Sequence, residues 1–288
     1  MKKQKNALLI IDPQNDFCHP NGSLFVPGAD EDNKRLAQWI LDNNEDIDTV
    51  VISLDSHQPN DIAHPVWFQD KDGNAPNPFS VITAEDVENG TWSAKFFPSN
   101  TLKYLKALES EGEFPHVIWP QHCIVGSWGH NIDERVLKAV ESWTTNGKFY
   151  RTVAKGTNPL TEHFGIFRAN IPLTGQPETQ LNFGIIKLLE EHDNVFFAGQ
   201  AKSHCVANSL KQVIEYTKDK KNKSDLANKF VIMTDCMSDV PGGPNGPGTT
   251  PTFGELAQSI YDEAKSMGIR FSDSTTRITN ISKTAVTA

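Results

Sequence analysis

Short apolar runs alternate with helix-length amphipathic stretches along most of the chain, and few architectures accommodate that alternation. Runs of strand length occur at 7–11, 49–54, 116–120, 149–154, 194–199 and 229–235. Helical periodicity appears at 31–44, 99–112, 131–145, 178–193 and 253–268, and a further helix is expected to begin near His204. Repeated strand–helix units predict an α/β fold with three αβα layers, in which helices cover both faces of a six-stranded, mainly parallel sheet.

Neither an internal repeat nor an interdomain linker is visible in the 288 residues. We therefore expect a single domain over residues 1–271. Residues 58–98 are rich in Pro, Asn, Asp and aromatic residues, so they are predicted to form a long loop insertion. The Ser- and Thr-rich end, residues 272–288, is predicted to be a flexible tail.

The charge and the cysteines restrict the partners and the compartment. A formal net charge of −9 argues against nucleic acid and against an anionic membrane surface, so a small molecule is the expected partner. The four cysteines are scattered without a C-x-x-C pair, which suits a reducing compartment. No apolar run has the length of a membrane span, and the apolar run near the start is too short for a signal peptide. We expect a cytoplasmic protein, and a homo-oligomeric state stays open.

Reactive side chains stand where the predicted strands end. The residues that follow five of the six runs are Asp12, then Asp55 with His57, His122, Lys155 and Cys205. Because ligands of a parallel sheet bind outside the carboxyl ends of its strands, these side chains are expected to meet at one edge. The pattern favours an enzyme over a structural protein.

Cys205, Asp12 and Lys155 can form a nucleophilic group. A thiol reacts as a thiolate, and Cys205 is expected in the first turn of a helix, where the helix dipole favours an anion. A lysine cation would favour the thiolate further, and a carboxylate could accept the thiol proton and return it to a leaving amine. The alternative is a buried, inert cysteine, which is common in protein cores.

Asp55, His57 and His122 can form a metal site. Asp-x-His places two ligand side chains on the same side of an extended segment, and His122 would supply a third ligand from the next strand end. Three protein ligands with open positions are typical of a catalytic divalent metal. His64 is a further candidate. The alternative is a set of loop histidines that make ordinary hydrogen bonds.

Five sequence blocks together resemble the nicotinamidase branch of the isochorismatase-like cysteine hydrolases. In chain order they are LLIIDPQNDFC, LDSHQPNDIAH, WPQHCIVGSWG, AKGTNPLTEHFGIF and FFAGQAKSHCVANSL. Each block alone is a weak match, but five in the family's order are specific.

The resemblance implies the family's fold and a role for each matching residue. Cys205 would be the nucleophile, Asp12 the general base and acid, and Lys155 the partner of the thiolate. A divalent metal would be bound, Zn²⁺ or alternatively Fe²⁺ or Mn²⁺. Asp55, His57 and His122 match the family's metal ligands, with His64 as a further ligand. Phe17 and Trp119 match the aromatic residues that bind the substrate ring. Ala201 and Cys205 match the residues whose backbone N–H groups form the oxyanion hole. The oxyanion hole would be shaped by a cis peptide bond at Gln200–Ala201.

The chain departs from the family pattern just before the nucleophile. Lys202 and Ser203 stand where the family usually has Thr-Asp, so the resemblance leaves the substrate open. The first expectation is metal-dependent hydrolysis of nicotinamide to nicotinate and ammonia through a thioester. The alternatives are another amide or a carbamoyl or ureido substrate, and a small-molecule binding relative without catalysis.

Overall fold

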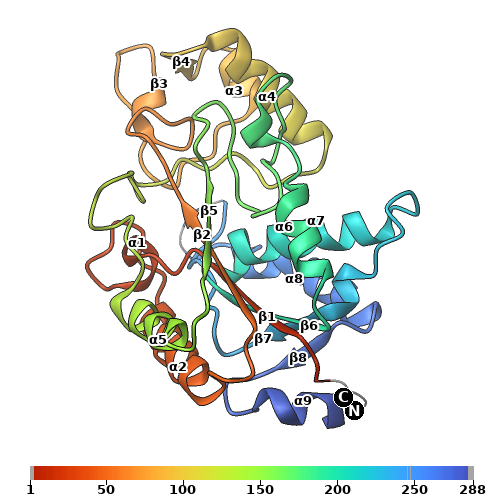
Figure 1. The fold of residues 1–288 in the computed structure, drawn as a ribbon. Coiled ribbons are helices and arrows are strands. Elements are labelled where there is room, and N and C mark those ends of the chain that lie inside the picture. Colours follow the sequence, from red (N-terminus) through yellow and green to blue (C-terminus); the bar gives the residue numbers. More distant parts are fainter. Residues whose placement is uncertain (1–2, 245, 247, 285–288) are drawn as a thin grey trace.

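The computed structural model describes residues 3–244, 246 and 248–284, and its central feature is a six-stranded sheet between two layers of helices (Figure 1). The strands of this sheet are β1 (Asn6–Ile11), β2 (Thr49–Asp55), β5 (Arg151–Lys155), β6 (Asn194–Gly199), β7 (Phe230–Met233) and β8 (Arg270–Ser272). Their order is β5-β2-β1-β6-β7-β8, and every neighbouring pair is parallel. The predicted fold class is confirmed.

Alternate residues of the buried strands supply the two halves of the core. Leu8 and Ile10 pack against helices α2, α5 and α9, whereas Leu9 and Ile11 pack against α6, α7 and α8 on the opposite face. The helices are α1 (Asn15–Cys18), α2 (Ala29–Asp42), α3 (Ala84–Glu88), α4 (Pro98–Ser110), α5 (Glu134–Thr144), α6 (Phe183–Glu190), α7 (Ala207–Lys218), α8 (Phe253–Ser266) and α9 (Ile278–Thr284).

The apolar run 116–120 does not join the central sheet, so that prediction is wrong. Its backbone pairs instead with the 58–98 segment, through an antiparallel bridge between Val81 and Val117. The sixth strand of the sheet is β8, which pairs with β7. The run is apolar because Ile118 packs into a separate small core with Ile62, Trp67 and other residues of that segment.

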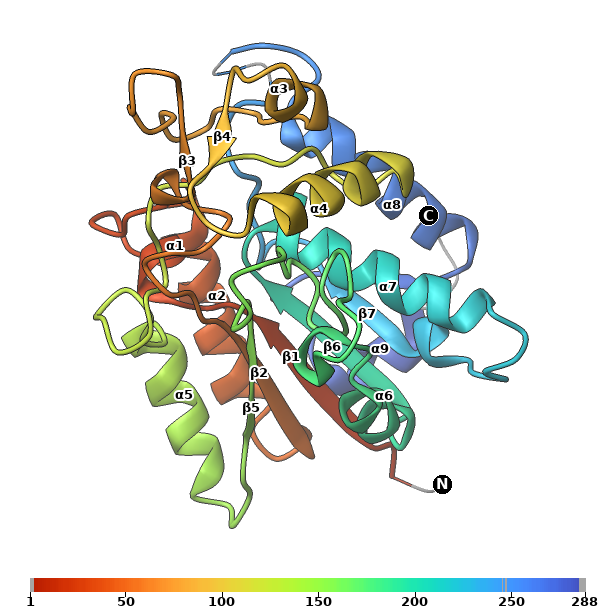
Figure 2. The same cartoon turned by 90° about the horizontal axis from the view of Figure 1, so that it is seen from above.

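The 58–98 insertion is more ordered than the loop that the sequence predicts. It contains a 3₁₀ turn at Pro65–Trp67, the two-stranded antiparallel sheet β3 (Phe68–Gln69) and β4 (Ser93–Ala94), and helix α3. Together with α4, these elements gather at one end of the molecule, beyond the central sheet (Figures 1 and 2).

The C-terminal segment also differs from its prediction as a flexible tail. Residues 270–272 form β8, and α9 buries Ile278 and Ile281 against the same core as α2. The Trp39 indole donates to the Thr276 carbonyl over 2.9 Å, and Ile278 N donates to Asn43 Oδ1 over 2.9 Å. Two isoleucines three residues apart are enough to dock one short helix face. Residues 285–288 lie outside the described residues.

Within the described part of the chain, none of the helices combines the length and apolar character needed to cross a bilayer.

Candidate active site

The carboxyl edge of the sheet brings the predicted nucleophilic group together. Asp12 directly follows β1, and Lys155 is the last residue of β5. Cys205 lies in a π-helical turn, Lys202–Val206, which connects β6 to α7. All three side chains are buried. Parallel pairing fixes this convergence, because every strand of the sheet ends at the same edge.

Lys155 is the centre of the group. Its Nζ lies 2.8 Å from Asp12 Oδ2, 3.0 Å from Asp55 Oδ1 and 3.5 Å from Cys205 Sγ. The ammonium therefore contacts two carboxylates and the thiol at once. Burial disfavours its charged form, but Asp12 and Asp55 overcome this and hold the pKa of Lys155 well above its usual value.

Burial and the neighbouring charges shift the pKa values of both Cys205 and Asp12. Burial raises the pKa of the Cys205 thiol well above its ordinary value, against the opposing effect of Lys155. Burial also raises the pKa of Asp12, while Lys155 and the Ser53 hydroxyl, which donates to Asp12 Oδ1 over 2.6 Å, act in the opposite direction. A carboxylate with a raised pKa is a better base for a thiol proton.

The segment before Cys205 has the backbone that the resemblance implies. The Gln200–Ala201 peptide bond is cis. The Gln200 side chain is anchored at both ends: its amide donates to Asp32 Oδ2 over 2.9 Å, and its oxygen accepts from Ser238 N at 3.1 Å. Ala201 and Cys205 both line the same pocket.

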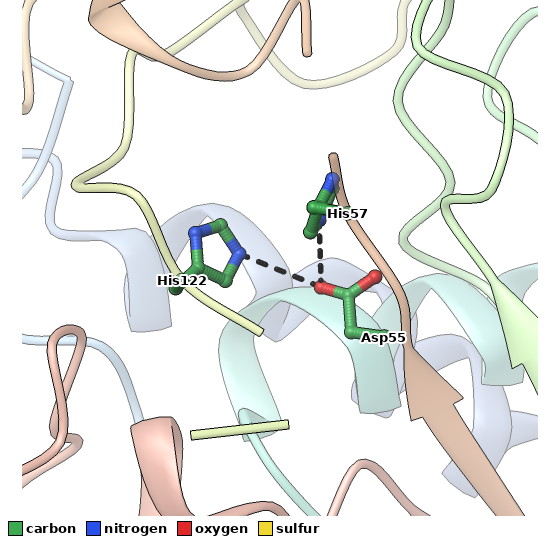
Figure 3. Close-up of side chains that lie close together, drawn as sticks. All are labelled: Asp55, His57 and His122. Atoms are coloured by element: carbon green, nitrogen blue, oxygen red, sulfur yellow. Dashed lines mark ion pairs between the residues drawn. The ribbon is translucent and has the colours of Figure 1, made fainter. Parts of the chain in front are cut away.

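Asp55, His57 and His122 lie together (Figure 3), and Asp55 also contacts Lys155 of the nucleophilic group. Asp55 Oδ2 is 3.1 Å from His57 Nε2 and 3.5 Å from His122 Nε2, and all three side chains are buried. Burial alone would raise the pKa of Asp55, but His57 and Lys155 hold it well below its usual range. One carboxylate and two imidazole nitrogens facing one another suit a divalent transition metal.

The outward ring nitrogen of each histidine faces a different group, through an ion-pair contact at His57 and a hydrogen bond at His122. His57 Nδ1 is 3.0 Å from Asp61 Oδ2, and His122 Nδ1 is 2.8 Å from the Pro120 carbonyl. Partners of this kind orient the ring and leave Nε2 free to bind a metal. Asp61 was not singled out in the sequence, although it lies within the Asp-x-His block.

His64 lies next to this group. Its ring centroid is 5.1 Å from that of His57 and 5.4 Å from that of His122. The side chain is fully buried, and neither ring nitrogen has a hydrogen-bond partner. Buried polar atoms are rarely left without a partner, so both nitrogens suit a role as a further metal ligand.

A narrow pocket has Cys205 in its lining together with several aromatic and imidazole rings. The predicted aromatics Phe17 and Trp119 line it. The sequence analysis missed Glu162, Phe164 and His204, which line it too, as do Leu24 and Val240. Glu162 and Phe164 follow Lys155 in its sequence block, and His204 precedes Cys205, so proximity to the predicted catalytic residues was the available signal.

Glu162 is an unusual member of this pocket. Its carboxyl group is buried, and Oε1 has no hydrogen-bond partner. Burial raises the pKa of Glu162 to about 8, so the group is mostly protonated at neutral pH.

Comparison with curated proteins finds nicotinamidases. A nicotinamidase of Saccharomyces cerevisiae is 26% identical over 202 residues, which cover 69% of this chain and 77% of the relative. A nicotinamidase of Acinetobacter baylyi is 25% identical over 241 residues, 83% of this chain and 84% of the relative. No family model matches the chain.

Solved structures share the fold. The yeast nicotinamidase bound to the inhibitor nicotinaldehyde superposes with a TM-score of 0.60 at 20% identity, covering 93% of this chain and 99% of that one. The pyrazinamidase of Pyrococcus horikoshii in complex with zinc has a TM-score of 0.50 at 16% identity, over 93% and 99%. The resemblance to the nicotinamidase-like cysteine hydrolases is confirmed.

Lys202 and Ser203, where the chain departs from the nicotinamidase-like pattern, do not line the pocket themselves, but Ser203 contacts two residues that do, Val240 and His204. Lys202 Nζ pairs with Asp239 at 3.4 Å and lies over the Tyr261 ring. Ser203 is buried, and its hydroxyl accepts from Val240 N at 3.0 Å. Both side chains therefore brace the turn that carries Cys205.

Proposed function

We propose that this protein is an amidohydrolase that converts nicotinamide and water to nicotinate and ammonia. The observation that carries the proposal is one pocket whose lining includes Cys205, Ala201, Asp55 and His122 together with aromatic rings. Lys155 contacts both the Cys205 thiol and the Asp12 carboxylate. The nicotinamidases of yeast and Acinetobacter baylyi support the substrate.

The side chains account for each step of the hydrolysis. Cys205 Sγ attacks the carboxamide carbon while its proton passes to Asp12. Backbone N–H groups of Ala201 and Cys205 stabilise the oxyanion, and Asp12 donates the proton to the departing amine, which leaves as ammonia. Water then attacks the thioester, its proton passing through Asp12 to the Cys205 sulfur as nicotinate is released. The Lys155 ammonium balances the negative charge throughout.

Asp55, His57 and His122 would hold a divalent metal, with His64 as a further ligand. The buried donor set and the orphaned His64 nitrogens fit such an ion. Zn²⁺ is the first candidate because the Pyrococcus horikoshii pyrazinamidase contains zinc, and Fe²⁺ and Mn²⁺ are alternatives. When bound, the metal supplies a Lewis acid for the lone pair of a pyridine nitrogen. Phe17 and Trp119 would hold the ring between them.

The compartment belongs to the same proposal. Cys18, Cys123, Cys205 and Cys236 are all free and buried, and hydrolysis through Cys205 requires a reduced thiol. Both points support a reducing location, the cytoplasm.

A substrate panel on metal-replete protein tests the proposal. The measured quantity is kcat/KM for ammonia release from nicotinamide, pyrazinamide, benzamide and a simple ureido acid. Nicotinamide and pyrazinamide carry a ring nitrogen meta to the carboxamide carbon, whereas benzamide has the same shape without it. We expect benzamide to be about a hundredfold poorer, the effect of losing one oriented contact. Equal values for benzamide and nicotinamide would exclude metal-oriented binding of the ring, and a preferred ureido acid would favour the carbamoyl alternative.

A further inference from the structure

The pocket wall that contains Trp119 is attached to the 58–98 insertion. Backbone bonds run from Phe79 N to the Ile118 carbonyl (2.5 Å), from Ile118 N to the Ser80 carbonyl (2.8 Å) and from Ile82 N to the His116 carbonyl (3.0 Å). Trp119 N donates to the Ala63 carbonyl over 2.8 Å. The insertion thus binds this segment by a short antiparallel ladder on one side and by Ala63 on the other.

Phe79 continues that attachment with its side chain. Its ring meets the Trp119 ring edge-on, with centroids 5.9 Å apart and an interplanar angle of 87°. Trp119 also contacts the rings of His204 and Phe253, and it lines the same pocket as Cys205. A T-shaped pair of this kind is a favoured arrangement of two aromatic rings.

Phe79 is partly exposed and has an unfavourable backbone conformation. The side chain is 38% exposed, so much of its ring is not buried. Its backbone has φ of 69°, a left-handed conformation that is unfavourable for a bulky residue. The contact of its ring with Trp119, which lines the pocket, connects this strained position with the site.

We infer that the insertion builds the outer wall of the substrate pocket and that Phe79 is a positioning residue, which holds the Trp119 ring against a bound aromatic substrate. This inference rests on the proposed function, because it assumes that the ring of the substrate lies against Trp119. It gives the 58–98 insertion a role in binding affinity that is separate from the chemistry at Cys205.

Phe97 offers a matched control within the same region. It follows the insertion's last strand, is 59% exposed and also has a left-handed backbone, with φ of 44°. Its ring, however, stacks on Trp67, which is not among the residues lining the pocket. Phe79→Gly and Phe97→Gly therefore both remove an exposed ring and both relieve an unfavourable φ, but only the first loosens Trp119.

The experiment compares the two variants and Phe79→Tyr with the unaltered protein, with KM and kcat for nicotinamide and the thermal midpoint as readouts. Phe79→Gly should raise KM about three- to tenfold, the worth of one edge-on aromatic pair, and leave kcat within about twofold. Phe97→Gly and Phe79→Tyr should keep the original KM. A purely structural role would instead appear as a lower thermal midpoint with unchanged KM.

The outcomes separate this inference from the proposed function. If the unaltered protein releases no ammonia from nicotinamide, the proposed function fails first. If it is active and Phe79→Gly has the same KM as Phe97→Gly, the positioning role is wrong while the function stands. If Phe79→Gly does not fold, Phe79→Leu keeps an apolar contact without a ring, and an unchanged KM in that variant would overturn the role equally.

Discussion

Two regions of the molecule meet at the pocket, and they are built differently. Asp12, Asp55, Lys155 and Cys205 stand at or just after the ends of central strands, where neighbouring strands fix their positions: Asp55 and Lys155 are direct partners in the β2–β5 ladder. Trp119 and His122 stand on a segment outside the sheet, held by the insertion.

The difference separates chemistry from substrate fit. The two carboxylates and the thiol that lie 2.8–3.5 Å from the Lys155 ammonium are carried by the ends of central strands and by the turn that follows β6. The aromatic wall, which needs only to match the shape of a ring, is carried by hydrogen-bonded loops. Loops generally tolerate change better than the strands that carry them.

The largest expected effect comes from the sheet edge. Cys205→Ala should lower kcat for nicotinamide by about a thousandfold or more, because no other group can form the thioester. Only the sulfur is removed, so the thermal midpoint should stay close to that of the unaltered protein. Ammonia release and a thermal melt measure both.

The control is Cys236→Ala, which removes a buried thiol from the core on the α2 face. It should keep full kcat. Iodoacetamide labelling adds a second comparison: Cys205 should react faster than the other three cysteines, because it lines the pocket beside the Lys155 ammonium. Near-normal turnover by Cys205→Ala would refute the mechanism.

The sheet edge could be predicted from the sequence, and the reason is physical. Buried parallel strands appear as continuous apolar runs, and their carboxyl ends share one edge, so residues that follow such runs are known to meet. The structure brings Asp12, Lys155 and Cys205 together and groups Asp55 with His57 and His122, as expected. What these residues do remains a prediction until the variants are measured.

The insertion-held wall could not be predicted in the same way. The run 116–120 is as apolar as a central strand, and only its pairing with 79–82 shows that it lies elsewhere. Asp61 contacts His57, four residues earlier, and Glu162 lines the pocket seven residues after Lys155, but strand and helix periodicity singles out neither position. Helix α9 was missed because a single pair of isoleucines docks it.

A second prediction asks whether the insertion reaches the metal group as well as the aromatic wall. Asp61 belongs to the insertion and contacts His57 Nδ1. Asp61→Asn removes the carboxylate charge that makes the imidazole a stronger ligand, so metal affinity should fall about 10- to 100-fold. Competition of the intact protein against a chelator of known affinity measures this without reference to activity.

Asp133→Asn is the matched control for that measurement. Asp133 is also buried, but it caps α5 and pairs with Arg135 away from the histidines. Its variant should bind the metal as the unaltered protein does. If Asp61→Asn also binds the metal with unchanged affinity, the insertion contributes only to the aromatic wall. The sheet edge and the insertion would then have fully separate roles.

The smallest effect concerns Glu162, which follows β5 and faces the pocket from neither the sheet edge nor the insertion. Its pKa is raised by burial from 4.5 to about 8, so the folded protein holds this proton more tightly than the unfolded chain. The stabilising contribution of this proton is therefore fully present below about pH 4.5 and is lost as the pH rises toward 8.

Glu162→Gln keeps the shape of the side chain and carries no charge. The stability of this variant relative to the unaltered protein should therefore increase from pH 5 to pH 8 and then stay constant. Melts of chelator-treated protein measure the difference, at about 2–4 °C per kcal/mol. If the stability difference between the two proteins does not vary with pH, Glu162 has an ordinary pKa and is ionised in the folded state. Its side of the pocket would then be as polar as the edge that carries Asp12 and Asp55.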